Sequence, residues 1–355
     1  MHNQHWFKTF LVVTIASFFT LTFGSSPEKT VVPVFLFSGQ SNMVCLGASV
    51  RDLPSAEQNM TFENIKIHNR SDNAKSGWET LKPGFGADAN HFGVELYFGK
   101  ALAEAMPETK MAFIKDATSG TYLGQSGGWL PPSSGGPGTL YRNMMDHIDK
   151  AMDKFNDAFD TSLYTPRWAG FIWHQGEFDA MNDQGLANKY EENLTNLIND
   201  IREMAEDDSM PAIIPMISGS MWQYKSIVQA AEAAVAEKLV NADTMKTEGL
   251  AFSNDNVHYN AASMKKIGTV CGEKWLAMEY TKDWWNPVPV VYQNRSSVSA
   301  SFSLNRTVYD LSGRMVGTRI PSQVSGTFQG HKAVQMFVVT SGSRQNVKVM
   351  NLENK

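Results

Sequence analysis

The sequence predicts an α/β fold with a mostly parallel sheet, followed by a small β-rich C-terminal module. From residue 31 to about residue 280, apolar strand-like runs alternate with amphipathic helical patterns, as in chains built from βαβ units. The strand-like runs are continuously apolar, which is typical of parallel strands buried on both faces. After residue 287 the pattern changes to short alternating runs with Ser/Gly turns and no helical period.

The elements follow one another at the spacing expected of such a fold. Strands are predicted at residues 31–37, 65–68, 111–114, 168–173, 212–217 and, more weakly, 249–252. Helices are predicted at residues 94–105, 140–155, 188–204, 227–239 and 261–278. Two long loops, residues 47–63 and 119–138, interrupt this pattern, and loops of that length inside a compact domain usually carry function.

The N-terminal sequence is typical of a secretory signal. An apolar run over residues 9–23 precedes Gly24-Ser25-Ser26, which resembles a small-residue cleavage site. A membrane anchor is the alternative, but a spanning helix needs about 20 apolar residues and this run is shorter. We therefore expect a signal peptide at residues 1–24, a main domain at residues 25–286 and a module at residues 287–355, in a secreted protein.

Charge is distributed unevenly along the chain. The formal net charge is -5, with +6 in residues 295–355 and -11 in the remainder. An acidic body does not suit nucleic acid, because phosphates must be neutralised by Lys and Arg. The basic module could hold the protein near an anionic cell envelope, and a plain solvated surface is the alternative.

Only two cysteines, Cys45 and Cys271, occur in 355 residues. The fold must therefore depend on its hydrophobic core and not on a disulfide framework. One bridge between them and two buried free thiols are equally compatible with the sequence.

Ser41 lies at the kind of position in which catalytic serines are usually found. It follows the apolar run at residues 34–37 within Ser38-Gly39-Gln40-Ser41-Asn42, so it lies at the carboxyl end of a strand. Open α/β sheets place their ligand crevice at that end. The alternative is a serine that caps the following helix.

A serine nucleophile needs a base, and the base needs an orienting acid. His258 stands in a loop three residues after a carboxylate, Asp255, and just before the last predicted helix. One turn could place that carboxylate against the imidazole. The alternative is that the Asp and Asn residues of this loop cap the helix.

A third polar segment follows the strand at residues 168–173. Gln175 could donate a hydrogen bond to an oxyanion, and Gly176 permits close approach of backbone or substrate. Glu177 and Asp179 add two carboxylates, for which a solvated loop or a glycosidase pair are alternatives.

A competing nucleophile is Ser126, since residues 124–128 satisfy G-x-S-x-G. That motif indicates a catalytic serine only where it joins a strand to a helix. Here Trp129-Leu130-Pro131-Pro132 follows it, so we interpret Ser126 as a loop residue.

Taken together, three segments resemble the SGNH-hydrolase carbohydrate esterases. They are Gly39-Gln-Ser-Asn-Met43, Trp173-His-Gln-Gly-Glu177 with Asp179, and Asp255-x-x-His258. The likeness is greatest to the sialate O-acetylesterase-like domain and to acetylxylan esterases of the sixth carbohydrate esterase family, and it covers residues 31–280. It implies a three-layer α/β/α, flavodoxin-like domain.

The resemblance also implies roles for single residues. Ser41 matches the nucleophile and His258 the general base. Gly120 matches a glycine that supplies an oxyanion-hole amide alongside that of Ser41, although the family often has two adjacent glycines where this chain has Ser119-Gly120. Gln175 takes the place of a further oxyanion donor that is asparagine in many relatives.

The acid that orients the base stays open. Asp255 fits the general pattern of the family, and Glu177 matches an acid that acetylxylan esterases of this type use. Gln40, Trp129 and Trp173 are expected to contact substrate, with Trp129 stacking on a sugar or, alternatively, only anchoring its loop.

The expected function is removal of acetyl groups from xylan or a related plant polysaccharide through a serine acyl-enzyme, without a metal or other cofactor. Histidine spacing such as H-E-x-x-H is absent from the sequence. A sialate or peptidoglycan O-acetylesterase is the alternative, and a carbohydrate-binding protein with a decayed site is one of another class. Residues 308–316 resemble a sorting module of secreted bacterial proteins, which could serve secretion, attachment or adhesion to substrate.

Overall fold

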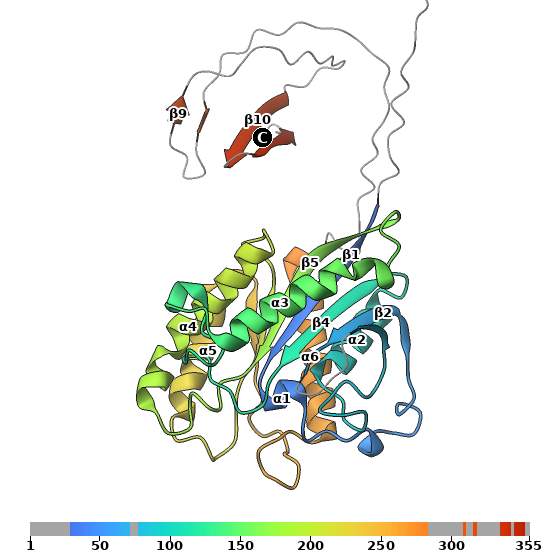
Figure 1. Ribbon diagram of the computed structural model, residues 1–355, viewed down its shortest axis with the longest axis vertical. Helices are drawn as coiled ribbons and strands as arrows, with labels where there is room; N and C mark the ends of the chain where they lie inside the picture. Colours follow the sequence, from blue (N-terminus) through green and yellow to red (C-terminus); the bar gives the residue numbers. More distant parts are fainter. Residues whose placement is uncertain are drawn as a thin grey trace, which may run out of the picture. The chain divides into compact units, whose positions relative to one another are not determined.

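The computed structural model describes residues 29–71 and 77–282 and, beyond them, the backbone of four strands. Its centre is a seven-stranded sheet in the order β3-β2-β4-β1-β5-β6-β7, shown in Figure 1. All neighbouring strands are parallel except β3, which runs antiparallel to β2. The strands are β1 (Thr30–Gly39), β2 (Phe62–Asn69), β3 (Trp78–Leu81), β4 (Met111–Ala117), β5 (Tyr164–His174), β6 (Ala212–Pro215) and β7 (Ala242–Met245).

Helices cover both faces of the sheet. The α-helices are α1 (Ser41–Val44), α2 (Val94–Ala105), α3 (Thr139–Asp153), α4 (Gln184–Met204), α5 (Lys225–Lys238) and α6 (Ala261–Ala277). Short 3-10 turns occupy Val50–Asp52, Pro132–Ser134, Phe155–Asp157 and Glu279–Thr281. Helices α2 and α6 pack in one apolar cluster and α3, α4 and α5 in the other, which gives three layers (Figure 1). The expected α/β/α architecture is confirmed.

The central strand β1 explains why both faces need a cover. Phe35 and Phe37 point into the cluster beneath α2 and α6, while Val34 and Leu36 point into the other. All four are fully buried. Because successive side chains of a strand alternate between faces, a continuous apolar run marks a strand covered on both sides.

One predicted strand is wrong. The last strand is β7 at Ala242–Met245, whereas in residues 249–252 only Phe252 forms an isolated bridge, with Tyr259. The sequence of β7, Ala-Asp-Thr-Met, is half-exposed at the edge of the sheet, so it lacks the apolar run of a central strand. The short edge strand β3 escaped prediction for the same reason.

Both cysteines are free thiols buried in the cluster beneath α2 and α6. Burial raises the pKa of the Cys45 thiol to about 12 and moves that of Cys271 in the same direction. Neither thiol therefore has thiolate character at neutral pH.

The chain divides into two units, residues 1–287 and residues 288–355. In the second unit β8 (Val308–Tyr309) pairs with β9 (Met315–Gly317), and β10 (Val334–Ser341) pairs with β11 (Arg344–Asn351), both antiparallel. The expected signal peptide at residues 1–24 lies outside the described residues. Within the described part of the chain, no helix is long and apolar enough to span a membrane.

Candidate active site

Ser41 lies at the carboxyl end of β1, as the first residue of the one-turn helix α1 (Figure 1). Its position depends on Gly39, which has φ +147 and whose Cβ, if present, would lie 2.1 Å from the carbonyl oxygen of His174. Only glycine lets β1 approach β5 this closely. The N–H of Gln40 then donates to that same carbonyl at 3.0 Å, which fixes the turn into α1.

His258 and Asp255 form a close pair in the loop between β7 and α6. The Nδ1 atom of His258 lies 2.6 Å from Oδ2 of Asp255. Since a carboxylate accepts, Nδ1 carries the hydrogen, and Nε2 is the nitrogen left to accept a proton. The His258 side chain is 17% exposed.

The carboxylate of Asp255 is held in this orientation by its other contacts. Its Oδ1 accepts the N–H groups of Val257 and His258, both at 2.9 Å, and the hydroxyl of Ser253 at 2.8 Å. Partial burial raises the pKa of Asp255, but these hydrogen bonds and the one from the imidazole outweigh it and place the pKa well below its ordinary value. Asp255 is therefore ionised beside the imidazole at neutral pH.

Glu177 contacts a different partner. Its Oε1 accepts a hydrogen bond from Nδ2 of Asn42 at 2.8 Å, and Oε2 is buried without a partner among the described residues. Burial raises its pKa, with the hydrogen bond from Asn42 acting in the opposite direction. Of the two candidate acids, the structure places Asp255 against the imidazole of His258.

Asn42, for which the sequence predicts no role, also lies in the candidate site. Besides Glu177, its side chain contacts the loop of His258 by accepting the N–H of Tyr259 at 3.1 Å. These partners are 135 and 217 residues away. Only its place next to Ser41 could have drawn attention to it.

Gly120 follows β4 in the left-handed backbone conformation, with φ +69. Its loop is tied to β1 by the N–H of Thr118, which donates to the carbonyl of Gly39 at 3.1 Å. Farther along the loop, the N–H groups of Leu123 and Gly124 donate to the carboxylate of Asp179 at 2.8 Å and 2.9 Å. These contacts hold the loop at the carboxyl end of the strands, where Ser41 also lies.

Asp179 belongs to a buried polar cluster that also contains Gln175. Burial raises the pKa of Asp179 to about 6, against the effect of its backbone and side-chain hydrogen bonds. Nε2 of Gln175 lies 2.7 Å from Oδ2 of Asp179, 2.9 Å from the carbonyl of Thr121 and 3.2 Å from Oε1 of Gln40. An amide has two hydrogens, and these three acceptors take both. The geometry does not fit the expected oxyanion role of Gln175, which instead anchors the loop of Gly120.

The expected substrate contacts need correction. Trp129 and Trp173 are fully buried and pack edge-to-face at 5.8 Å in the cluster beneath α3, α4 and α5. Neither ring has a face free for a sugar, so Trp129 acts only as the apolar anchor of its loop. Gln40 is also buried, with its Oε1 accepting from Gln175.

A partly exposed aromatic pair, which the sequence does not predict, lies beside Gly120. The rings of Tyr122 and Phe178 are edge-to-face at 5.3 Å, and both residues are half-buried. A Cβ added to Gly120 would lie 3.3 Å from the Phe178 ring. This pair, and not the tryptophans, offers an aromatic surface next to the candidate oxyanion hole.

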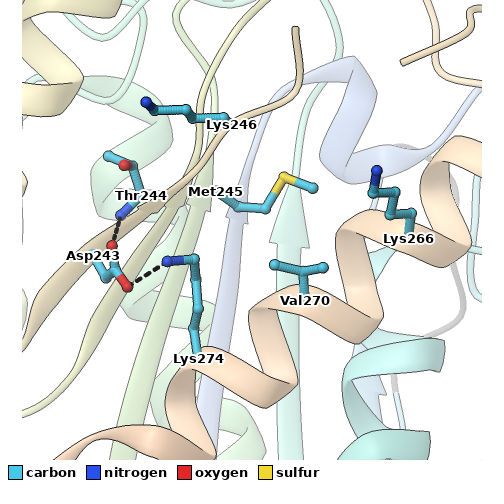
Figure 2. A pocket seen from close by; sticks show the side chains of 7 residues that line it. All are labelled: Asp243, Thr244, Met245, Lys246, Lys266, Val270 and Lys274. Carbon is cyan, nitrogen blue, oxygen red and sulfur yellow. Dashed lines mark hydrogen bonds and ion pairs between the residues drawn. The ribbon is translucent and has the colours of Figure 1, made fainter. Parts of the chain in front are cut away.

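Ser126 is exposed within a turn, in agreement with its interpretation as a loop residue. A cavity of about 430 Å³ between β7 and α6 contains none of the candidate site residues. Figure 2 shows its lining, in which Lys274 pairs with Asp243 at 2.6 Å. Among the residues the structure describes, no group of three or more His, Cys, Asp or Glu side chains could hold a metal ion.

Comparisons with known proteins place this arrangement in context. The model of the family described as carbohydrate esterase, sialic acid-specific acetylesterase, matches residues 31–277. No protein of curated function was found to match the chain.

Several solved structures are similar. A protein from Arabidopsis thaliana is 20% identical, with a TM-score of 0.55 over 70% of this chain and 98% of that one. A carbohydrate acetylesterase from Xanthomonas citri is 13% identical, with a TM-score of 0.49 over 90% of this chain and 70% of that one. NanS is 14% identical, with a TM-score of 0.48 over 70% and 97%. The Arabidopsis structure shows that the fold is shared.

Proposed function

The chain belongs to the carbohydrate esterase family of sialic acid-specific acetylesterases, and from this premise we propose that it removes acetyl groups from sugar hydroxyls through an acyl-enzyme on Ser41. The family assigns it to the hydrolases that act on acetyl esters of carbohydrates. The observation that carries the serine mechanism is the Asp255–His258 pair, whose loop is hydrogen-bonded to the residue next to Ser41.

In the proposed reaction, Nε2 of His258 takes the hydroxyl proton of Ser41 while Oγ attacks the acetyl carbonyl carbon. The charge on the tetrahedral oxygen is stabilised by the N–H groups of Ser41 and Gly120. The imidazolium formed at this step is stabilised by the ionised carboxylate of Asp255, 2.6 Å from Nδ1.

Collapse of that intermediate releases the sugar, whose oxygen takes the proton from Nε2 of His258. Water then attacks the acetyl-enzyme, with His258 as base again, and acetate leaves with Ser41 restored. The proton of Ser41 passes through His258 to the sugar oxygen, and one proton of the water passes through His258 to restore the Ser41 hydroxyl. The cycle therefore consumes one water and releases the free sugar hydroxyl and acetic acid, which ionises to acetate.

The proposed substrate is acetylated xylan or a related plant polysaccharide, by resemblance to acetylxylan esterases. The family description favours acetylated sialic acid as the second candidate, and O-acetylated peptidoglycan is a third. Acetate release from the three substrates under identical conditions tests the choice. A clear preference for sialic acid or peptidoglycan would refute the xylan assignment while leaving the mechanism intact.

The contrasting proposal is that the chain is a carbohydrate-binding protein whose esterase site has decayed. The retained Asp255–His258 contact argues against it. A fluorophosphonate distinguishes the two, because it labels only a serine that a neighbouring base activates. No label on the folded wild-type protein would favour the binding protein.

We also propose that the protein is exported, on the basis of the apolar run at residues 9–23. The mass of the mature protein recovered from its native host tests this, with loss of about 24 residues expected from the position of the small-residue site. Residues 287–355 have no assigned role in this proposal.

A further inference from the structure

The side chain of Asn42 joins the turn of the candidate nucleophile to the loop of the candidate base. Asn42 follows Ser41 in α1 and is 2% exposed. Its Oδ1 accepts the N–H of Tyr259 at 3.1 Å, and its Nδ2 lies 3.5 Å from the carbonyl oxygen of Val257. These two groups flank His258, so one side chain contacts the backbone on both sides of the base.

The contacts with Tyr259 and Glu177 together fix which way the amide of Asn42 faces. Nδ2 donates to Oε1 of Glu177 at 2.8 Å, while the N–H of Tyr259 can only donate and so must face Oδ1. A flipped amide would set two donors against each other and two oxygens against each other. Because both side chains are buried, water does not compensate for a lost partner.

A second contact seats the same loop on the segment that follows α1. A Cβ added to Gly47 would lie 2.6 Å from the carbonyl oxygen of Tyr259 and 2.8 Å from Cβ of His258. The loop of His258 thus touches both Asn42 and Gly47. The hydrogen-bonding contacts between this loop and α1 come from the side chain of Asn42.

We propose that Asn42 and Glu177 are a positioning pair that holds Nε2 of His258 in reach of Ser41, without touching the substrate. This inference rests on the proposed function, because it concerns proton transfer in that site. A general base must lie within about 2.6–3.2 Å of the proton it takes, and a displacement of about 1 Å can cost about 10²-fold in rate. In this role Glu177 acts as an acceptor, which a glutamine can replace.

The test uses Asn42→Asp, Glu177→Gln and the double variant, with p-nitrophenyl acetate as substrate from pH 5 to pH 9. Asn42→Asp places a carboxylate oxygen against Oε1 of Glu177, and the two buried acids stay in contact only while they share a proton. We expect kcat to fall about 10²-fold relative to wild type at the alkaline end. The ratio should recover as the pH falls, with little change in KM.

The double variant restores a donor and an acceptor in reversed positions. We expect its kcat to return to within about tenfold of wild type, without the pH-dependent ratio of Asn42→Asp, and Glu177→Gln alone to cost only a few-fold. A uniform loss in Asn42→Asp that Glu177→Gln does not relieve would overturn the pairing. So would a loss near 10³-fold in Glu177→Gln alone, because it would mean that the charge of Glu177 acts on His258 directly.

Thermal unfolding of the same four proteins keeps the two proposals separate. A wild-type protein that hydrolyses no acetyl ester would refute the proposed function. The pairing would still be tested, because residues in contact give a coupling energy from their unfolding and independent residues do not. Additive effects on unfolding would then overturn it.

Discussion

Replacing Asp255 with asparagine tests the assignment of the orienting acid. Oδ1 of Asp255 accepts the N–H groups of Val257 and His258, which can only donate. An asparagine must keep its oxygen there, so its Nδ2 hydrogens would face Nδ1 of His258. The imidazole would then carry its hydrogen on Nε2, where it cannot accept the proton of Ser41.

The size of the effect follows from the exposure of the pair. In a buried triad this change lowers kcat by about 10⁴-fold. The Asp255 side chain is 46% exposed, so water can partly replace it, and we expect a loss of about 10³-fold, or ~4 kcal/mol in the barrier. Ser253→Ala is the matched control, because it removes only the 2.8 Å contact to Oδ1.

The assay is kcat for acetate release at saturating substrate, with circular dichroism to confirm folding. Asp255→Asn should lose about 10³-fold and Ser253→Ala less than about tenfold. A loss below tenfold in Asp255→Asn, together with a loss near 10³-fold in Glu177→Gln, would refute the assignment and transfer the role to Glu177.

Two further predictions concern the core beneath the site. Trp129→Ala should cost about 3–5 kcal/mol of unfolding free energy with KM unchanged, because the ring is fully buried; a higher KM at unchanged stability would instead show sugar stacking. Burial lowers the pKa of His174 from 6.5 to about 3, so its contribution to stability is present above pH 6.5 and is lost as the pH falls toward 3. Between pH 7 and pH 4.5, the unfolding free energy of His174→Phe, which keeps the stacking on Tyr259, should therefore fall by about 2–3 kcal/mol less than that of wild type, as measured by urea unfolding. Equal losses in the two proteins would contradict this.

The central part of the fold could be predicted from sequence because its strands are buried on both faces. The run at Val34 to Phe37 is apolar at every position, and the structure buries each of these residues. The edge strand β7 could not be found this way, because its Asp243 and Thr244 are half-exposed and break the pattern. An apolar run therefore predicts the position of a strand only where that strand is buried on both faces.

The site divides along similar lines. Asp255 and His258 stand three residues apart, so their 2.6 Å contact could be anticipated from one turn. The contact of Asn42 with Glu177 joins residues 135 apart and depends on the sheet order. The sequence leaves both sugar stacking and loop anchoring open for Trp129, because its burial in a tertiary contact with Trp173 is not visible in the sequence.

The central claim is that Ser41 is the nucleophile of a carbohydrate O-acetylesterase. Acetate release from an acetylated glycan, measured for wild type, Ser41→Ala and Ser126→Ala, tests it most directly, since Ser126 lies in the competing G-x-S-x-G segment at residues 124–128. The account predicts that Ser41→Ala abolishes acetate release while Ser126→Ala, an exposed turn residue, retains it. Activity retained in Ser41→Ala, or lost in Ser126→Ala with the fold intact, would contradict the account.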